Sequence, residues 1–303
     1  MANRIESPLL SIVMSTYMHS EYIEESIRSV WAQNYPNLEI CIVDDCSSDD
    51  TFEILKRLKA LAPFPMDIFR NLTNLELTAT ISRALSLAKG KYIAFLSGDD
   101  CYFPNRFEDQ IDLMEKDPEM MVVVGNGRVF KGGEFLQQVH SDAVKSLLSK
   151  NPSEILTFLY THPSPFFIQT LLVRRDFILS SGSFDQSMLS DDWVLNIRFF
   201  RRLVSSGKFA FIDKDFFRYR IHDTNVHKRF WRHNIQKLQV IWKYAPLSLK
   251  RKGFSNIIYD IGLHCIYKQW KIAGNALYLF AQTLNYDSSR HEKMNSAKIH
   301  SQS

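Results

Sequence analysis

Three pairs of adjacent aspartates, spread among apolar stretches, are the residues of this chain best suited to chemistry. They are Asp44-Asp45, Asp99-Asp100 and Asp191-Asp192. Two carboxylates at the carboxyl end of a buried strand are costly to desolvate, so they usually serve a ligand or a metal ion. One such pair alone is more often a solvated cap in a turn. Three pairs, followed by the basic segment Arg-Tyr-Arg-Ile-His at 218–222, favour a common site.

The apolar pattern around these pairs predicts strands that alternate with helices. Strands are expected at residues 9–14, 39–43, 66–70, 91–96 and 120–124. Helical spacing predicts four helices between these strands. Three have a buried face that can be named: Ile23, Ile27, Val30 and Trp31 in the first; Phe52, Leu55, Leu58 and Leu61 in the second; and Phe107, Ile111 and Met114 in the fourth, which begins after Pro104. The third is expected at residues 78–89, with Gly90 as its C′ residue. This order predicts an α/β fold with a doubly wound, mostly parallel sheet. Such sheets bind ligands beyond the carboxyl ends of their strands.

The rest of the chain divides into two further regions. Residues 131–220 show a less regular pattern, which is typical of a substrate-specific region laid over a sheet. The pattern then becomes helical, so we expect a catalytic domain at 1–225 and a helical extension at 226–303. Three apolar stripes are expected in that extension: Trp231, Ile235, Leu238 and Trp242; Phe254, Ile257, Ile258, Ile261 and Cys265; and Ile272, Ala276, Phe280 and Leu284.

Charge is distributed unevenly along the chain. Residues 226–303 carry 13 Lys and Arg against 3 Asp and Glu, whereas residues 1–225 have a net charge of −6. The basic extension could pack on the body, form a homodimer, or lie on an anionic membrane. Its headgroup contacts would be Lys228, Arg229, Arg232, Lys250, Arg251 and Lys252. No nucleic-acid-binding motif accompanies the charge, so nucleic acid is the least favoured partner.

Composition places few other limits on function. The 303 residues are 45% hydrophobic and 23% charged, as in an ordinary soluble globular protein. No apolar run reaches the length of about 18 residues expected of a membrane-spanning helix. The first residues have no apolar signal-peptide core, and the four cysteines are scattered without a Cys-X-X-Cys pair. These features favour a protein of the reducing cytoplasm.

Five segments, in order along the chain, resemble family-two glycosyltransferases of the bacterial surface-polysaccharide type. Residues 10–17 (LSIVMSTY) and 42–51 (IVDDCSSDDT) resemble the start of that family's nucleotide-sugar site. Residues 88–100 (AKGKYIAFLSGDD) resemble the strand that leads into its Asp-X-Asp metal motif. Residues 182–193 resemble the segment of the catalytic base, and residues 219–222 (YRIH) the basic element after it. The resemblance covers residues 8–225 and implies the GT-A fold, with a Rossmann-like, mostly parallel twisted sheet flanked by helices.

The resemblance also implies a donor site. Thr16, Tyr17 and Asp45 would hold the uracil and ribose of a UDP-sugar, with Asp44 nearby. Asp99 would bind both the nucleotide and a Mn²⁺ or Mg²⁺ ion that bridges the two phosphates, and His222 would complete the metal site. A cation is physically reasonable because the chain has no Gly-X-Gly-X-X-Gly or Walker loop to neutralise a diphosphate. Oxygen ligands suit Mg²⁺ and Mn²⁺.

By the same resemblance, Asp192 would be the general base of an inverting single displacement. It would deprotonate an acceptor hydroxyl as that hydroxyl attacks the anomeric carbon. Asp191 and Trp193 are weaker candidates for acceptor contacts, and packing is the alternative for Trp193. The implied setting is bacterial surface-polysaccharide assembly, such as O-antigen or capsule, on a saccharide acceptor that is lipid-linked. The protein would then be cytoplasmic or peripheral on the inner membrane face.

Two departures from the family leave alternatives open. Ser97 stands where the family often has Asp, and Met18 where it often has Asn. Ser97 alone encourages the hypothesis of a non-catalytic binding or scaffold protein on a GT-A fold, and the retained Asp45, Asp99, Asp192 and His222 argue against it. A nucleotidyltransferase would need a glycine-rich basic loop after the first strand, which residues 15–19 do not provide.

Overall fold

One mixed sheet organises the part of the chain that the structure describes. The structure is a computed structural model, and it describes residues 7–188, 191–222, 230–267, 277–281 and 284. The sheet has nine strands in the order β3-β2-β1-β4-β8-β6-β9-β5, with β7 paired to β6. Their bounds are β1 Leu10–Thr16, β2 Leu38–Asp44, β3 Met66–Arg70, β4 Tyr92–Ser97, β5 Cys101–Tyr102, β6 Met120–Lys131, β7 Glu134–Gln138, β8 Leu171–Arg174 and β9 Lys208–Ile221.

The first four strands form the parallel half of the sheet. Every residue of β1 and β2 is buried, as expected for strands covered on both faces. Thr16 pairs with Asp44, and Ser15 pairs with Ser97. The carboxyl ends of β1, β2 and β4 therefore meet at one edge of the sheet. This register brings two of the three acidic pairs to that edge.

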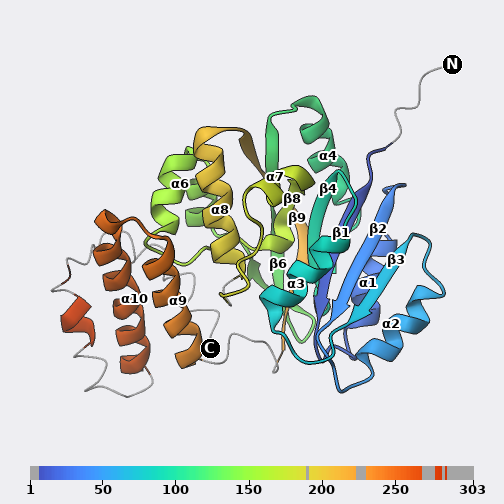
Figure 1. Ribbon diagram of the computed structural model, residues 1–303, viewed down its shortest axis with the longest axis horizontal. Coiled ribbons are helices and arrows are strands. Elements are labelled where there is room, and N and C mark those ends of the chain that lie inside the picture. Colours follow the sequence, from blue (N-terminus) through green and yellow to red (C-terminus); the bar gives the residue numbers. More distant parts are fainter. Residues whose placement is uncertain (1–6, 189–190, 223–229, 268–276, 282–283, 285–303) are drawn as a thin grey trace.

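Helices cover both faces of the sheet (Figure 1). The bounds of the helices are α1 Ile23–Trp31, α2 Thr51–Lys59, α3 Leu77–Leu87, α4 Phe107–Lys116, α5 Asp142–Leu148, α6 Pro152–Leu159, α7 Arg175–Ser180, α8 Asp191–Ser205, α9 Phe230–Tyr244 and α10 Leu247–Tyr267, with a 3-10 turn, η1, at Ile168–Thr170. Alternate strand residues point to two separate cores. Val13 and Phe95 pack with α3, α6 and α8, whereas Ile12 and Leu96 pack with α1, α2 and α4.

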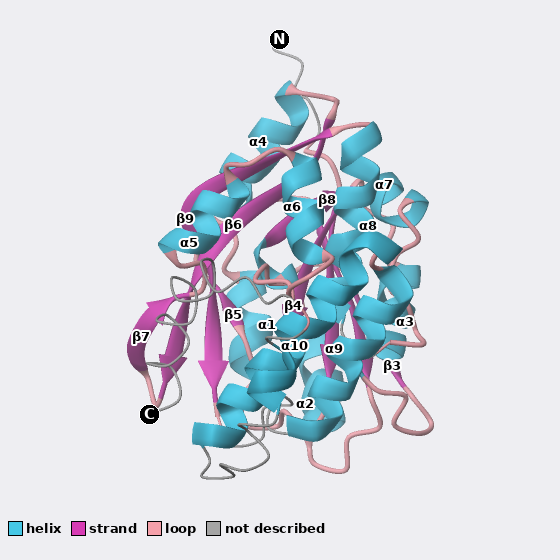
Figure 2. Ribbon diagram, turned by 90° about the vertical axis from the view of Figure 1, so that its left-hand side faces the viewer, coloured by secondary structure: helices cyan, strands magenta, loops and turns pink. Residues whose placement is uncertain are grey.

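Two long strands extend the sheet beyond its parallel half. β6 and β9 run parallel to each other through several register shifts, and they lie side by side in Figure 2 with β7 at the margin. β5 pairs with β9 in an antiparallel sense, so that Cys101 lies opposite Arg218. β5 follows the second acidic pair directly, and His222 follows β9. This pairing therefore returns the end of β9 to that acidic pair.

The helical extension packs against α6 and α8 at the opposite end of the molecule from α1 and α2 (Figure 1). Asp185 holds it in place, because the carboxylate accepts hydrogen bonds from Lys243 Nζ at 2.6 Å and from the Tyr244 hydroxyl. Arg201 adds a bond from its guanidinium to the Tyr244 carbonyl. Among the described residues, no helix combines the length and apolar character needed to cross a bilayer. The predicted domain boundary at 225 lies outside the described residues.

The apolar stripe predicted for the first helix of the extension was wrong at two of its four positions. Ile235 and Trp242 are 53% and 67% exposed, whereas Leu238 packs against the core and the side chain of Trp231 lies outside the described residues. Val240, Ile241 and Tyr244 form the buried face of α9. The helix carries two apolar faces, and periodicity alone could not show which one meets the body. In the second stripe Ile257, Ile261 and Cys265 are buried as predicted. In the third, Phe280 is exposed, and Ile272 and Ala276 lie outside the described residues.

Three smaller predictions also need correction. Gly90 does not have a positive φ and is no C′ residue; a Cβ there would lie 2.7 Å from both Leu9 O and Ser11 N, so it serves close packing. Leu61 is 64% exposed and lies beyond the end of α2. The segment at 131–220 is more regular than expected, because it contains α5 to α8, β8 and most of β9.

Candidate active site

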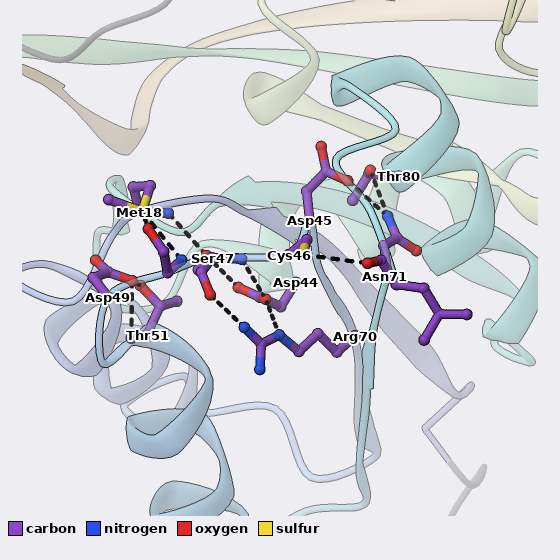
Figure 3. A network of polar contacts seen from close by, with 12 residues as sticks. Met18, Asp44, Asp45, Cys46, Ser47, Asp49, Thr51, Arg70, Asn71 and Thr80 are labelled. Atoms are coloured by element: carbon purple, nitrogen blue, oxygen red, sulfur yellow. Dashed lines mark hydrogen bonds and ion pairs between the residues drawn. The ribbon is translucent and has the colours of Figure 1, made fainter.

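Asp44 organises the turn that follows β2 (Figure 3). Its carboxylate is fully buried and accepts hydrogen bonds from the Ser47 amide, at 2.9 Å, and from the Ser47 hydroxyl. Arg70 Nε lies 3.4 Å from the same carboxylate. Burial raises the pKa of Asp44, and the hydrogen bonds from Ser47 oppose that rise. All of these contacts are to other residues of the protein, so Asp44 stabilises the turn after β2.

Asp45 presents one carboxylate oxygen to the protein. Its Oδ1 accepts hydrogen bonds from Asn71 Nδ2 and from the Leu75 amide, both at 2.8 Å. Asn71 also donates to Thr80 Oγ1, as Figure 3 shows. No described residue donates to Oδ2 of Asp45. This carboxylate is therefore held firmly at one oxygen, and within the described residues the other accepts no hydrogen bond.

The segment after β1 lies against the same turn. Thr16 is buried, and its hydroxyl lies 3.2 Å from His19 Nδ1, whereas Tyr17 is 47% exposed. Met18 has a φ of 59°, a conformation in which Asn is commoner than Met, and its amide donates to Ser47 Oγ at 2.9 Å. A Cβ on Gly98 would lie 2.5 Å from Thr16 Oγ1. The ends of β1 and β4 therefore approach closely because Gly98 has no side chain.

Asp99 is the centre of the second cluster. Its Oδ2 accepts a hydrogen bond from His222 Nε2 at 2.9 Å and lies 3.7 Å from His19 Nε2, while Oδ1 accepts one from the Ser97 hydroxyl. Burial raises the pKa of Asp99, but the hydrogen bond from His222 and the charge of His19 outweigh burial and hold it at about 2. The carboxylate is therefore ionised at neutral pH. Burial lowers the pKa of His19 despite the opposing effect of Asp99.

Asp100 is buried behind this cluster. Its Oδ1 accepts a hydrogen bond from the Arg220 amide at 2.9 Å, and its buried Oδ2 has no hydrogen-bond partner among the described residues. Burial and the adjacent Asp99 carboxylate raise the pKa of Asp100 well above its usual value. Asp192 also contributes to this rise, so it lies close enough to couple electrostatically to the cluster.

Asp192 lies in the first turn of α8, next to η1. Its Oδ1 accepts a hydrogen bond of 3.4 Å from the Ile168 amide. Trp193 is buried, and its indole nitrogen donates to the Leu159 carbonyl at 2.7 Å. That ring packs in the core, which is the alternative that the sequence allowed for it. The side chain of Asp191 lies outside the described residues.

The sequence model of glycosyl transferase family 2 matches residues 11–182 of this chain, which is more than half of its length. The chain belongs to glycosyl transferase family 2. A relative in Bacillus subtilis, described as the putative glycosyltransferase EpsE, is 38% identical over 116 residues, covering 38% of this chain and 42% of EpsE. The Escherichia coli glucosyltransferase WfaP is 35% identical over 107 residues, or 35% of this chain and 41% of WfaP. Both matches therefore span less than half of the relative's length.

Solved structures resemble this glycosyltransferase in fold. Residues 1–349 of Staphylococcus aureus TarS, in complex with UDP-GlcNAc, match with a TM-score of 0.63 at 15% identity, covering 90% of this chain and 79% of that 1–349 chain. The Pyrobaculum calidifontis mannosyltransferase PcManGT, in complex with GDP-Man and Mn²⁺, matches with a TM-score of 0.59 at 15% identity, covering 97% and 81%. The family and the GT-A-type α/β fold that the sequence predicted are thereby confirmed.

The protein donors in this glycosyltransferase fit a divalent cation only in part. Asp99 Oδ2 and the imidazole of His222 meet at 2.9 Å, and a carboxylate with an imidazole is a donor set that Mn²⁺ accepts. No group of three or more His, Cys, Asp or Glu side chains within the described residues is arranged to hold a metal by itself. Mg²⁺ and Mn²⁺ are commonly held by one or two protein ligands together with substrate phosphates. The donor set therefore fits an ion that binds with the nucleotide.

Several residues at this site were not assigned from the sequence. His19 lies between Thr16 and Asp99, and Arg220 donates through its backbone amide to Asp100 and through its side chain to Glu25 at 2.5 Å. Arg83 on α3 donates to Asn71 Oδ1 at 2.6 Å and so supports the partner of Asp45. None of these side chains has a spacing signal. His19 lies in the loop between β1 and α1 and Arg220 lies in β9, so the tertiary fold alone brings these residues to the site.

Proposed function

We propose that this chain transfers a sugar from a UDP-sugar to an acceptor hydroxyl with inversion, assisted by a divalent metal ion. The observation that carries the proposal is the arrangement of acidic centres at one sheet edge: Asp45, whose Oδ2 accepts no hydrogen bond from the described residues, and the Asp99–His222 pair. Asp192, at the start of α8, lies close enough to raise the pKa of Asp100 beside that pair. A nucleoside would be held at Asp45, its diphosphate at that pair, and the acceptor at Asp192. WfaP, a UDP-glucose-dependent enzyme by its name, and the TarS complex with UDP-GlcNAc support a UDP-sugar donor.

The residues of the chain have separable roles in this proposal. Asp45 Oδ2 accepts a hydrogen bond from the base, while Thr16 and Tyr17 flank the nucleoside. Asp99 and His222 would hold the Mn²⁺ or Mg²⁺ ion. When bound, that ion would neutralise the charge that develops on the departing diphosphate. Asp192 accepts the proton of the acceptor hydroxyl as the new bond to the anomeric carbon forms and the bond to the diphosphate breaks.

The proposed setting is the assembly of a surface polysaccharide on a lipid-linked acceptor. WfaP supports it, because that enzyme is described as a glucosyltransferase acting on α-D-GlcNAc-diphosphoundecaprenol. A peripheral membrane contact would use the outer face of α9 and the start of α10. There Trp242 is exposed with Lys250 Nζ 4.4 Å from its ring centroid, and Leu247 is 86% exposed. Exposed Trp and Leu beside lysines are typical of surfaces that lie on anionic lipid.

The experiment that tests the proposal is a single-turnover assay with radiolabelled UDP-sugars and lipid-linked saccharides, with the anomeric configuration of the product determined by NMR. Transfer with inversion that stops on addition of EDTA is expected. A product that retains the donor's configuration, or transfer that is unaffected by EDTA, would contradict the mechanism.

A further inference from the structure

A cavity with several basic side chains in its lining lies at the edge of the sheet opposite the acidic site. It has a volume of about 710 Å³ and is lined by Lys89, Lys91, Arg174, Arg175 and Arg202, with Asp176 as the one carboxylate. We call it the basic pocket. Lys91 immediately precedes β4 and Asp99 follows the same strand, so the seven residues between them span roughly 20–25 Å at the rise of an extended chain. A donor bound at Asp99 does not reach the basic pocket.

The cations of the basic pocket differ from most others in the body in having few acidic partners. Lysines and arginines elsewhere commonly form ion pairs, for example Lys145 with Asp213 and Lys214 with Asp109. Within the described residues, Lys91 is the one pocket cation with an ion pair, to Glu115 at 2.6 Å. Arg174 lies close enough to Glu115 and Asp117 for its charge to lower the pKa of both carboxyl groups. Lys89, Arg175 and Arg202 therefore concentrate positive charge on a concave surface of a region, residues 1–225, whose net charge is −6. Such a surface attracts an anion strongly.

Neutral backbone groups hold two of the arginines in place. Arg174 donates from Nε to the Met120 carbonyl at 2.7 Å, and Arg175 from Nε to the Ala88 carbonyl at 2.8 Å. The Arg174 guanidinium also lies 5.4 Å from the centre of the Tyr92 ring. Carbonyls fix a guanidinium without cancelling its charge. The pocket is therefore arranged in advance for an anionic ligand, which reduces the entropy lost on binding.

We propose that the basic pocket binds a phosphate group, carried either by a small molecule or by a lipid headgroup. Every guanidinium nitrogen of Arg174 donates to a carbonyl or to the Tyr92 hydroxyl, so this residue contributes charge only. The guanidinium groups of Arg175 and Arg202 match the oxygens of a phosphate, and lysine adds point charge. The volume of the pocket is in the range that accommodates small organic ligands. This inference goes beyond the proposed sugar transfer and does not rest on it.

The test compares two double variants of the full chain in the presence of EDTA. K89Q/R202Q removes two pocket charges whose side chains make no recorded hydrogen bond, and K59A/K131A removes two exposed charges elsewhere on the body. Thermal unfolding is followed with glycerol 3-phosphate against NaCl at equal ionic strength. Flotation is measured with phosphatidylglycerol vesicles against phosphatidylcholine vesicles. UDP binding with Mn²⁺ serves as an independent readout of the acidic site.

We expect saturable stabilisation by glycerol 3-phosphate, with an affinity about 10-fold weaker in K89Q/R202Q and unchanged in K59A/K131A, as for the loss of a charge-assisted hydrogen bond. Binding confined to phosphatidylglycerol vesicles, and weakened only in K89Q/R202Q, supports the proposal with a lipid headgroup as the source. Equal behaviour of the two double variants towards both probes overturns it. So does stabilisation that NaCl reproduces. Loss of UDP binding in K89Q/R202Q also overturns it, because the two sites would then not be separate.

Discussion

Replacing Asp45 by Asn and by Ala separates the structural role of this residue from its proposed role in binding. In Asp45→Asn the amide oxygen can still accept the hydrogen bonds of Asn71 and Leu75. The amide nitrogen then replaces Oδ2, so a donor faces the ligand where the wild-type protein has an acceptor. The fold should survive this change, and nucleotide binding should not.

The magnitudes follow from the contacts. In Asp45→Ala, the Asn71 amide loses one acceptor while it is 2% exposed, whereas Leu75 lies in a more exposed segment where water can replace the carboxylate. One buried unsatisfied donor costs about 1–3 kcal/mol of unfolding free energy. Asp45→Asn should cost less than about 1 kcal/mol, because both acceptor contacts remain. Loss of a hydrogen bond to a carboxylate weakens UDP binding by about 1.5–3 kcal/mol, or 10- to 100-fold.

Urea denaturation measures the losses of unfolding free energy in the two variants. Isothermal titration calorimetry with UDP and Mn²⁺ measures the loss of UDP affinity. The matched control is Asp112→Asn, the same chemical change on the exposed face of α4, which should alter neither. Wild-type affinity for UDP in Asp45→Asn would refute the assignment of Oδ2 to the base. An equal loss of stability in the Asn and Ala variants would refute the hydrogen-bond account of its support.

Four other perturbations follow from the site and from the helical extension. Asp192→Asn should lower kcat for transfer by about 10²- to 10⁴-fold with donor affinity unchanged, and near-normal turnover in single-turnover kinetics would exclude it as the base. Asp99→Ala should abolish the Mn²⁺ dependence of UDP binding in calorimetry; binding that still responds to EDTA would contradict the metal assignment. Asp185→Asn should lower the melting temperature at pH 7. Hydrogen bonds from Lys243 and Tyr244 outweigh burial and depress the pKa of Asp185 below its ordinary 3.8. The difference in melting temperature between wild type and variant should therefore disappear as the pH falls below about 4. A difference that grows on acidification would contradict this. Trp242→Ala should reduce flotation with phosphatidylglycerol vesicles but leave the melting temperature within about 1 °C, since the ring is 67% exposed; unchanged flotation would exclude this face from membrane contact.

The parallel half of the sheet could be predicted because its strands are continuous apolar runs. Leu10–Thr16 and Leu38–Asp44 are buried on both faces, and they are separated by a helix with a clear apolar stripe. β8 has only four residues, and β9 mixes apolar with charged positions, so neither gives a clear period. The buried face of α9 was predicted wrongly at Ile235 and Trp242, because these exposed residues have as regular a helical spacing as the buried residues do.

The candidate site could be predicted as a set of residues but not in its detail. Acidic pairs along the chain indicated three positions, and the family resemblance then selected Asp45, Asp99 and Asp192. The pattern of pairs alone could not distinguish Asp44 from Asp45, because the two differ only in which partners the strand and the turn present to them. His19 reaches Asp99 only because Gly98 permits close approach of β1 and β4. Such contacts between distant segments carry no local signal.

The most direct test of the central claim is binding and hydrolysis of a panel of UDP-, GDP- and dTDP-sugars with Mn²⁺, with Mg²⁺ and with EDTA. We predict that a UDP-sugar binds and is slowly hydrolysed in the presence of the metal ion, and that EDTA abolishes both. A folded protein that binds no nucleotide-sugar under any of these conditions would contradict the account and favour a non-catalytic protein on the same fold.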